Sequence, residues 1–420
     1  MNRMLDTVVR RLVQTGSLEV VDSAGNTRTY GDGTGNLIRL RFTRKSAERN
    51  VMIYPGLKFG EEFMNGGFVF DRGSVYDFLE LVFSNLKDTY PTKLMEYGAK
   101  VRYATRRLRQ ANNQRRARRN VAHHYDLDGR LYSLFLDKDL QYSCAYFEEG
   151  ETNLEVAQLA KKRHLASKLA LQPGQKVLDI GSGWGGLGLY LAERCGVEVT
   201  GVTLSEEQFE TSNRRAKERG LSDRVRFLLQ DYRTLEGPFD RIVSVGMFEH
   251  VGVGHFREYF NTCRDLMKPD GVMLLHSIGR FEGPGDTNSW IQKYIFPGGY
   301  IPAISETVPA IELADLKITD VEVLRLHYAK TLRVWRERFM AHREQAKQIY
   351  DERFCRMWEY YLAGSETSFR YWDLMNFQIQ ITRDQNVLPL TRNYMFEAEE
   401  RLRAEDERAV ARGALKLAGE

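Results

Sequence analysis

The sequence predicts an α/β protein whose main domain contains a parallel sheet and which begins with a smaller α+β domain. A short apolar run, Val177–Ile180, ends in a glycine-rich turn, Gly181–Gly186, and a helical pattern follows at once. Strand patterns then alternate with helix patterns as far as Ser277, as in βαβ units whose strands lie parallel. Residues 1–100 instead show short alternating segments separated by turn residues, which is typical of a small α+β domain.

Bulk composition is that of a soluble globular protein of two or three domains. The chain has 420 residues, of which 42% are hydrophobic and 28% charged, and its net charge is +4. It contains no run of about 18 apolar residues that would span a bilayer, and charges within Met1–Leu12 interrupt any signal-peptide core. The cysteines lack metal-ligand spacing, which indicates reduced cytoplasmic thiols. They are Cys144, Cys195, Cys263 and Cys355.

The N-terminal domain is expected to begin with an amphipathic helix over residues 1 to about 20 and to hold a second helix at Val75–Asn85. Alternating patterns predict its strands. These are Ser17–Val21, Leu37–Thr43, Asn50–Tyr54 and Gly67–Asp71. Nothing in this domain is catalytic by inspection, and a structural or dimerising module fits it as well as a ligand-binding one.

A basic segment, residues 101–120, separates this domain from the rest of the chain. It contains no acidic residue, and its arginines are Arg102, Arg106, Arg107, Arg109, Arg115, Arg116, Arg118 and Arg119. Such a run is commonly a solvated linker. The alternative is attraction to anionic phospholipid headgroups, at roughly 1 kcal/mol per basic residue near the surface. No nucleic-acid recognition motif accompanies the segment, so nucleic acid is not expected as a partner.

The main domain is expected to follow a regular alternation of strands and helices. The strands are Lys176–Ile180, Val197–Val202, Val225–Leu229, Asp240–Val245 and Val272–Ser277, and the helices are Gly185–Cys195, Glu206–Gly220 and His255–Met267. Ligands of open parallel sheets bind at the carboxyl ends of the strands. The candidate site residues are therefore in Gly181–Gly185, Thr203–Gln208, Gln230–Tyr232, Gly246–His250 and His276–Ile278.

The glycine-rich turn alone is ambiguous. Gly181, Gly183 and Gly186 fit the G-x-G-x-x-G pattern of dinucleotide sites. However, the second strand runs into Thr203–Ser205 and lacks the acid that holds the ribose of NAD. Asp179, before the first glycine, suits a cationic ligand. These features favour S-adenosylmethionine, which is positive at its sulfur and its amine, over NAD; a turn without any ligand is the third possibility.

Beyond about residue 320 the chain is expected to be helical and is rich in aromatic residues. They include Trp335, Phe339, Tyr350, Phe354, Trp358, Tyr361, Phe369, Tyr371, Trp372 and Phe377. Core packing explains most of them, and a cap that lines an apolar acyl tunnel is the alternative. Residues 401–420 are expected to form a charged tail without a functional role.

Several motifs agree in order and spacing with one family. They are Tyr142–Phe147, the glycine-rich turn, Thr203–Gln208, Met247–Gly252 and His276–Gly279. Over roughly residues 120–395 the chain resembles the cyclopropane-fatty-acid synthase family. The resemblance implies a Rossmann-like S-adenosylmethionine-dependent methyltransferase domain with a helical cap at residues 121–400. Residues 1–100 are similar to the lipid-binding domain of the phospholipid-acting members.

The resemblance also implies a reaction. The cis double bond of an unsaturated phospholipid acyl chain takes the sulfonium methyl group, and loss of a proton from that methyl closes a cyclopropane ring. The implied base is bicarbonate, and the matching residues are Cys144, Glu249, His276, Ile278 and Tyr328. A carbocation needs a nearby anion, a dry pocket and aromatic faces, so this arrangement is chemically sensible.

Each of these residues also has a structural explanation. The structural explanation for Cys144 is a small buried apolar residue. For Glu249 it is an ordinary helix start, and for His276 a core histidine whose hydrogen bonds are satisfied. Tyr328 depends on the local match alone. His250 and His255 lack a third ligand at suitable spacing, so no metal site is expected.

The resemblance and the positions after strands together give a cofactor site. Gly181, Gly183 and Gly185 are expected to cradle the methionine part, with Asp179 beside them. Around the rest of the cofactor, Thr203, Leu204 and Gln208 replace the ribose-binding acid, Asp231 and Tyr232 flank the adenine, and Tyr142 and Ser143 close over the top.

Three functions remain open from the sequence: cyclopropanation, methylation of the same double bond without ring closure, and lipid binding by an inactive methyltransferase fold. The intact site residues argue against the last. The expected setting is the cytoplasm, with peripheral attachment to the inner face of the membrane through the basic segment, and a homodimer is expected from the resemblance.

Overall fold

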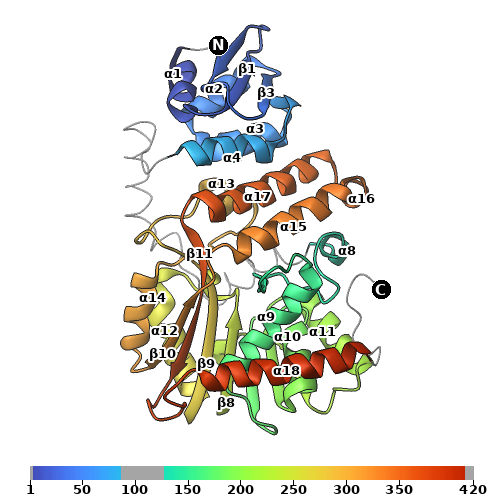
Figure 1. Ribbon diagram of the computed structural model, residues 1–420, viewed down its shortest axis with the longest axis vertical. Coiled ribbons are helices and arrows are strands. Elements are labelled where there is room, and N and C mark those ends of the chain that lie inside the picture. Colours follow the sequence, from blue (N-terminus) through green and yellow to red (C-terminus); the bar gives the residue numbers. More distant parts are fainter. Residues whose placement is uncertain (1–2, 87–126, 412–420) are drawn as a thin grey trace. The chain divides into compact units, whose positions relative to one another are not determined.

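The computed structural model describes residues 3–86 and 127–411 (Figure 1). The basic segment at residues 101–120 lies outside the described residues. Two compact units are present. Unit 1 comprises residues 1–108, 286–297 and 332–374, and unit 2 comprises residues 109–285, 298–331 and 375–420. Among the described residues, no helix has the length and apolar character needed to cross a membrane.

Unit 1 begins with a small sheet covered by helices. Its first elements are α1 (Arg3–Leu12), β1 (Ser17–Val21), β2 (Thr27–Tyr30), β3 (Leu37–Phe42), α2 (Lys45–Ile53), α3 (Pro55–Met64), β4 (Phe68–Arg72) and α4 (Val75–Asn85). The strand order is β2-β1-β3-β4, with β1 and β3 parallel and the other pairs antiparallel. Leu18, Leu40 and Phe68 on the strands pack with Phe63 and Leu79 of the helices.

One expected strand of this unit is wrong. Residues Asn50–Tyr54 belong almost entirely to helix α2, and not to a strand. Ala47 and Val51 are both buried, and their spacing of four residues places them on one face of a helix. The apolar run at 51–53 is too short to distinguish the two periods.

Helices from the second half of the chain complete unit 1. They are α13 (Ser289–Tyr294), the part of α15 (His327–Ala341) from residue 332 onward, α16 (Arg343–Ile349) and α17 (Glu352–Tyr371). Glu61 of α3 accepts hydrogen bonds from Lys293 Nζ at 2.6 Å and from Tyr294 Oη at 3.0 Å. The Arg336 guanidinium lies 3.9 Å from the ring centroid of Tyr76. The aromatic helices therefore form one compact body with the N-terminal sheet.

Unit 2 is built on a seven-stranded sheet of order β10-β11-β9-β8-β5-β6-β7 (Figure 1). The strands are β5 (Lys176–Ile180), β6 (Glu198–Thr203), β7 (Val225–Leu229), β8 (Phe239–Val245), β9 (Met267–Arg280), β10 (Lys317–Val323) and β11 (Leu374–Thr382). The pairs among β5 to β9 are parallel, as expected from the sequence, whereas β10 and β11 pair antiparallel.

Helices cover both faces of this sheet. One core joins the strands to α9 (Leu154–Lys168), α10 (Gly186–Cys195), α11 (Glu206–Glu218) and α18 (Asn393–Ala411). The other joins them to α12 (Phe256–Leu266) and α14 (Ile304–Glu312). Short helices are α8 (Gly129–Ser133), η1 (Tyr232–Thr234), η2 (Phe248–His250) and η3 (Val253–His255).

The expectation of an all-helical region beyond residue 320 is wrong at β11. Its apolar residues Met375, Phe377, Ile379 and Ile381 alternate with polar residues, which is the two-residue period of a strand. Both faces of β11 are buried, so the polar side chains that alternate with them need partners inside the protein. These polar side chains are Asn376, Gln378, Gln380 and Thr382.

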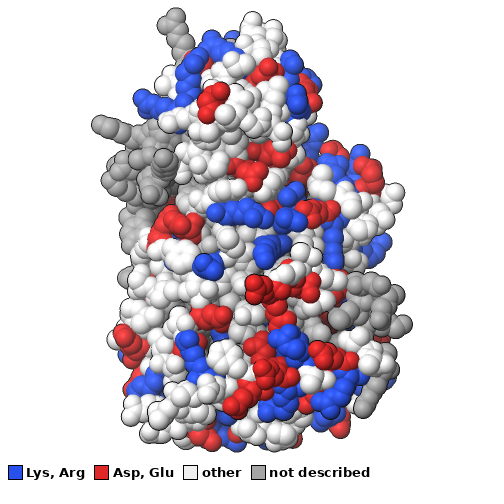
Figure 2. Space-filling view, viewed as in Figure 1, with Lys and Arg blue, Asp and Glu red and all other residues white. Residues whose placement is uncertain are grey.

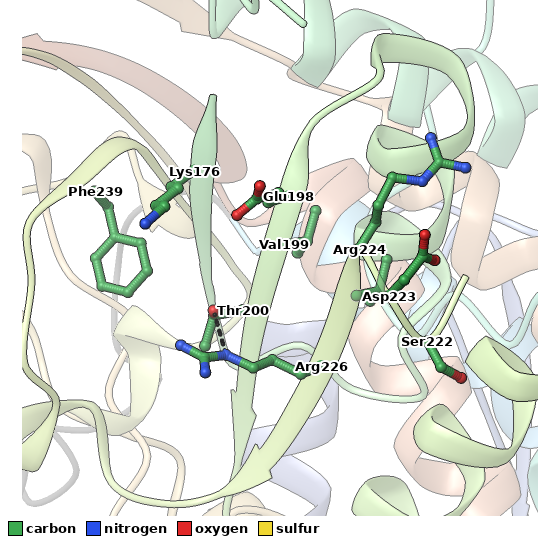
Figure 3. Close-up of a pocket in the computed structure, with 10 residues that line it drawn as sticks. Lys176, Glu198, Val199, Thr200, Ser222, Asp223, Arg224, Arg226 and Phe239 are labelled. Atoms are coloured by element: carbon green, nitrogen blue, oxygen red, sulfur yellow. Dashed lines mark hydrogen bonds between the residues drawn. The ribbon is translucent and has the colours of Figure 1, made fainter. Parts of the chain in front are cut away.

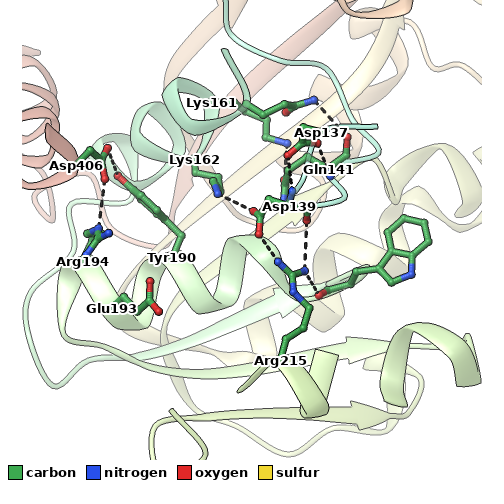
Figure 4. Close-up of polar contacts among 12 residues, drawn as sticks. Asp137, Asp139, Gln141, Lys161, Lys162, Tyr190, Glu193, Arg194, Arg215 and Asp406 are labelled. Atoms are coloured by element: carbon green, nitrogen blue, oxygen red, sulfur yellow. Dashed lines mark hydrogen bonds and ion pairs between the residues drawn. The ribbon is translucent and has the colours of Figure 1, made fainter. Parts of the chain in front are cut away.

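Residues 401–411 continue helix α18 and pack against the sheet's helices. Asp406 is buried and accepts a hydrogen bond from Arg163 at 3.1 Å. It also accepts from Tyr190 Oη at 3.1 Å and from Arg194 at 3.3 Å (Figure 4). These contacts tie α18 to α9 and α10, so this part of the charged C-terminal segment contributes to the core of unit 2.

Candidate active site

The glycine-rich turn follows β5 with three residues in the left-handed region. Gly181 has φ 83°, Gly183 φ 54° and Gly185 φ 82°. A Cβ on Gly181 would lie 2.9 Å from Cβ of Met247, and one on Gly185 would lie 2.7 Å from the Phe227 ring. At Gly183, in contrast, no described atom lies within 4 Å of an added Cβ. Two glycines are therefore required by packing, and the middle one borders open space suited to a ligand.

Asp179 lies at the end of β5 and is 2% exposed. Burial raises the pKa of its carboxyl to about 7, and the nearby charge of Lys161 opposes this shift. Its Oδ2 atom has no hydrogen-bond partner within the described residues. An unpartnered buried carboxylate oxygen is costly. A cationic ligand group would satisfy it, so the turn fits the amine of S-adenosylmethionine.

A segment before the sheet lies against this turn. Lys161 Nζ donates hydrogen bonds to Gln141 Oε1 at 2.6 Å and to Ser143 Oγ at 2.7 Å. Arg215 donates to the carbonyl of Trp184 at 2.6 Å and pairs with Asp139 (Figure 4). The structure thus brings the segment that carries Tyr142 and Ser143 next to the glycine-rich turn.

The ends of β6 and β7 supply the remaining cofactor candidates. Thr203 Oγ1 donates to Gln208 Oε1 at 2.7 Å, and both side chains are buried, while Leu204 between the two is half-buried. Asp231 accepts from Arg233 at 2.9 and 2.7 Å, so both its carboxylate oxygens are engaged. The neighbouring Tyr232 packs edge-on against Tyr259 with ring centroids 5.6 Å apart. The adenine contacts of Asp231 and Tyr232 stay a prediction.

A second cluster lies at the ends of β8 and β9. Glu249 Oε1 accepts a hydrogen bond from the backbone N–H of Ile278 at 2.6 Å. Its other oxygen, Oε2, has no partner within the described residues. Burial raises the pKa of Glu249 to about 7, although the bond from Ile278 works in the opposite direction. This carboxyl therefore takes up a proton far more readily than an exposed glutamate.

His276, two residues before Ile278, is 1% exposed and contacts two amides of β11. Its Nδ1 lies 3.2 Å from Gln378 Nε2, and its Nε2 lies 3.4 Å from Asn376 Nδ2. Burial lowers the pKa of His276 to about 3, and the charges of Lys161 and Lys168 add to the effect. The imidazole is therefore neutral at physiological pH. The two amides were missed from the sequence, although the polar alternation of β11 marks them.

Cys144 is buried, and burial raises the pKa of its thiol, so it is not a thiolate. The backbone N–H of the next residue, Ala145, donates to Thr331 Oγ1 at 3.1 Å. Thr331 lies one helical turn after Tyr328, which is itself buried. The residue after the Tyr-Ser-Cys motif therefore lies against α15, the helix that also carries Tyr328.

Lys161 connects the two clusters electrostatically. It is 1% exposed, and burial lowers its pKa to about 8. Its charge also acts on the pKa values of Asp179, Cys144 and His276. One buried ammonium group therefore acts electrostatically on three side chains that are far apart in the sequence. Lys161 was not among the residues expected from the sequence, because α9 has the composition of an ordinary charged helix.

Other groups do not form a second centre in the described residues. No three His, Cys, Asp or Glu side chains of residues 3–86 and 127–411 are arranged to hold a metal ion. A pocket of about 270 Å³ lies at the amino ends of β5, β6 and β7, where Lys176, Glu198 and Arg224 line it (Figure 3). This is the edge opposite the carboxyl ends of the strands, so the pocket is separate from the candidate site.

The strand order, the glycine-rich turn and the buried acid of β5 define an S-adenosylmethionine-dependent methyltransferase. The model of the mycolic acid cyclopropane synthetase family matches residues 112–379. Cyclopropane-fatty-acyl-phospholipid synthase of Escherichia coli is 39% identical over 335 residues, which cover 80% of this chain and 85% of that relative. The chain belongs to the mycolic acid cyclopropane synthetase family.

Two further comparisons bear on the activity. Tuberculostearic acid methyltransferase UfaA1 of Mycobacterium tuberculosis is 41% identical over 281 residues, which cover 64% of this chain and 66% of that relative. The solved structure of mycolic acid cyclopropane synthase CmaA1 complexed with SAH and CTAB matches with a TM-score of 0.60 and 35% identity. That match covers 63% of this chain and 97% of the other.

Proposed function

We propose that this enzyme transfers a methylene group to the cis double bond of unsaturated phospholipid acyl chains and forms cyclopropane fatty acids. One observation carries the proposal: the bond of Glu249 to the backbone of Ile278, on the strand that also holds the neutral His276. Both side chains are buried and lie at the carboxyl edge of the sheet. A site that deprotonates a carbocation must be shielded in this way, because water would otherwise quench the cation.

S-adenosylmethionine supplies an electrophilic methyl group when bound. Asp179 and the glycine-rich turn would hold its methionine part, and Thr203, Leu204 and Gln208 its ribose. Asp231 and Tyr232 would lie beside the adenine, with Tyr142 and Ser143 as the cover. The fit is supported by the unpartnered oxygen of Asp179 and by the open space at Gly183.

Bicarbonate supplies the base in this proposal and would be held by Cys144, Glu249, His276, Ile278 and Tyr328. The ionisation of these groups supports anion binding. Cys144 keeps its proton, His276 is a neutral donor, and Glu249 is protonated below about pH 7. A protonated Glu249 donates a hydrogen bond to an anion, whereas a carboxylate would repel it.

The phospholipid substrate is supported by the length of the similarity. The match to the Escherichia coli relative includes more of the chain than the matches to the mycobacterial proteins. On the face in Figure 2, acidic and basic side chains of the described residues are interspersed. We propose that the basic segment at residues 101–120, which lies outside the described residues, attaches the enzyme to the inner face of the membrane, because its arginines would attract anionic headgroups. The homodimer stays a prediction.

A second candidate is methylation of the same double bond without ring closure. It is favoured by the similarity to a relative named as a methyltransferase, which matches at 41% identity. Both reactions pass through a methylated carbocation on the acyl chain. They differ in the bond that forms when the proton is lost: cyclopropanation closes the ring, whereas branching forms a new double bond and leaves an unsaturated branched chain.

Lipid mass spectrometry separates the two. The enzyme is produced in a host without cyclopropane lipids, and the host is fed methionine labelled in its methyl group. The Glu249→Ala variant is the inactive control. Cyclopropanation predicts labelled chains heavier by one CH₂ (~14 mass units), which resist mild hydrogenation. A labelled product that still takes up hydrogen or shows a methyl branch would replace cyclopropanation by branching. Absence of label in every acyl chain would reject both.

A further inference from the structure

A line of buried polar side chains leads from His276 toward the outside of unit 2. Gln378 Nε2 lies 3.2 Å from His276 Nδ1, and Gln378 Oε1 accepts a hydrogen bond from Lys168 Nζ at 2.7 Å. Lys168 in turn pairs with Glu322. His276, Gln378 and Lys168 are all 3% exposed or less, so water does not compete for these contacts.

The lysine fixes the orientation of the glutamine. An ammonium group has three donors and no acceptor, so only the oxygen of the Gln378 amide can face Lys168. The NH₂ group of the same amide must then face His276. Because NH₂ is only a donor, it requires an acceptor at Nδ1, and a ring nitrogen accepts only when it carries no proton. In a neutral imidazole the single proton then lies on Nε2.

We propose that Lys168 and Gln378 are positioning residues that fix the tautomer of His276 with its proton on Nε2, so that the ring presents an N–H donor to the anion site. The inference deepens the proposed function and rests on it for the identity of that anion. It assigns a role to a charged residue that no motif marks and that reaches the reaction only through Gln378 and His276.

The contact of the other ring nitrogen shows what a proton on Nε2 would require. Asn376 Nδ2 lies 3.4 Å from His276 Nε2, and the Asn376 Oδ1 atom is buried without a partner among the described residues. Two donors cannot bond to each other. A donor on Nε2 therefore leaves two outcomes: the Asn376 amide turns over to accept from it, or both donors point to one anion. In both outcomes His276 donates a hydrogen bond through its Nε2 proton.

The far end of the line is held by charge. Glu322 receives Lys168 and also His164, whose Nε2 lies 2.7 Å from its carboxylate. Burial would raise the pKa of Glu322, but these hydrogen bonds and charges lower it to about 2. The carboxylate is thus ionised under working conditions and keeps the Lys168 ammonium in place, with its donor aimed at Gln378.

The test is ¹⁵N NMR of the full chain labelled in its histidines, with the His276 signals assigned by their loss in His276→Asn. The chemical shifts distinguish a protonated from an unprotonated ring nitrogen. The expected result for the wild type is a protonated Nε2 and an unprotonated Nδ1. In Gln378→Glu a carboxylate still pairs with Lys168 but accepts from Nδ1, so the proton should move to Nδ1. Gln380→Glu places the same charge two residues along β11, and should leave the tautomer unchanged.

Variants at the lysine give an independent test if Gln378→Glu does not fold. Lys168→Arg keeps a pure donor and should keep the wild-type tautomer, whereas Lys168→Met should give a mixture and lower kcat at least tenfold with little change in KM for S-adenosylmethionine. A wild-type His276 protonated on Nδ1, or a tautomer that does not respond to Gln378→Glu and Lys168→Met, overturns the inference. If the tautomers behave as expected but bicarbonate leaves the His276 signals unmoved, the bicarbonate assignment fails and the positioning role stands.

Discussion

The two halves of the proposed active site are built in different ways. The cofactor half is a backbone structure: a turn of glycines after β5, and residues within a few positions of the ends of β6 and β7. The anion half is a side-chain structure, in which Glu249, His276 and Cys144 come from separate segments and obtain their protonation states from burial. The cofactor half should therefore be sensitive to substitutions that add volume, and the anion half to substitutions that change the polarity of a side chain.

The largest effect is expected from Gly185→Ala. Its φ of 82° disfavours a Cβ, which would also lie 2.7 Å from the Phe227 ring and 2.8 Å from Ser212. Strain and overpacking together should lower the free energy of unfolding by about 2–4 kcal/mol. Chemical denaturation measures this loss, and calorimetry with S-adenosylmethionine measures the accompanying loss of binding.

Gly183→Ala is the matched control for that variant. Its Cβ meets no described atom within 4 Å, so only the positive φ opposes it and the stability loss should be about 1 kcal/mol. Affinity for S-adenosylmethionine should nevertheless fall, because the added methyl group occupies the open space. Equal stability losses in the two variants would contradict the distinction between a packing glycine and a ligand-facing one.

In the anion half, Glu249→Ala should lower kcat about 100- to 1000-fold, because it removes the acceptor of the Ile278 N–H and the donor to the anion. Glu249→Gln keeps an oxygen for Ile278 and an NH₂ group in place of the acid, so it should retain more activity. Affinity for S-adenosylmethionine, measured by calorimetry, should be unchanged in both. A parallel loss of cofactor affinity would show that the two halves are not separable.

The elements of the proposed cofactor half are more visible in the sequence than those of the proposed anion half, for a physical reason. A strand, a glycine-rich turn and a helix are consecutive, so their pattern is visible locally. The side chains that surround His276 come from β11 and α9, 100 or more residues away, and depend on strand pairing that a local pattern does not contain. The polar alternation of β11 was present in the sequence but was hidden within an aromatic-rich region.

Helix α9 shows the same limit. Its sequence is rich in basic residues and looks like a solvated helix, yet Lys161, Lys162, Arg163, His164 and Lys168 are all buried. Each has its partners elsewhere in unit 2. Lys161 reaches the Tyr-Ser-Cys segment, Arg163 reaches α18, and Lys168 reaches β10 and β11. The local sequence around a buried charged residue does not show that it is buried when its partner is far away in the chain.

A smaller effect is expected in the pH dependence of stability. The pKa of Glu249 in the folded protein, about 7, lies above its ordinary value, so its neutral form stabilises the fold. That contribution is complete below the ordinary pKa and is lost as pH rises through 7. It amounts to about 1–3 kcal/mol, since one pKa unit corresponds to about 1.4 kcal/mol. Buried His250 and His276, with lowered pKa values, act in the opposite direction at acid pH.

The difference between wild type and Glu249→Gln isolates the carboxyl from those histidines. Urea denaturation at several pH values should show the wild type losing stability between pH 5 and 8 relative to the variant. Without ligand, the wild type should also lose stability relative to Asp179→Asn over this pH range, because burial raises the pKa of Asp179 to about 7 as well. Parallel profiles for wild type and Glu249→Gln would mean that Glu249 is ionised in the folded protein at all these values of pH.

The smallest effect is expected from Ser143→Ala, at the boundary between the halves. It removes one of the two acceptors of Lys161, a bond of 2.7 Å, while the bond to Gln141 remains. A single hydrogen bond of this kind is worth about 1 kcal/mol, so affinity for S-adenosylmethionine should fall about fivefold with kcat unchanged. Ser167→Ala is the control, since its hydroxyl bonds only a carbonyl of its own helix. A fall in kcat instead of affinity would place Ser143 with the anion half, because Lys161 would then act mainly through His276 and Cys144.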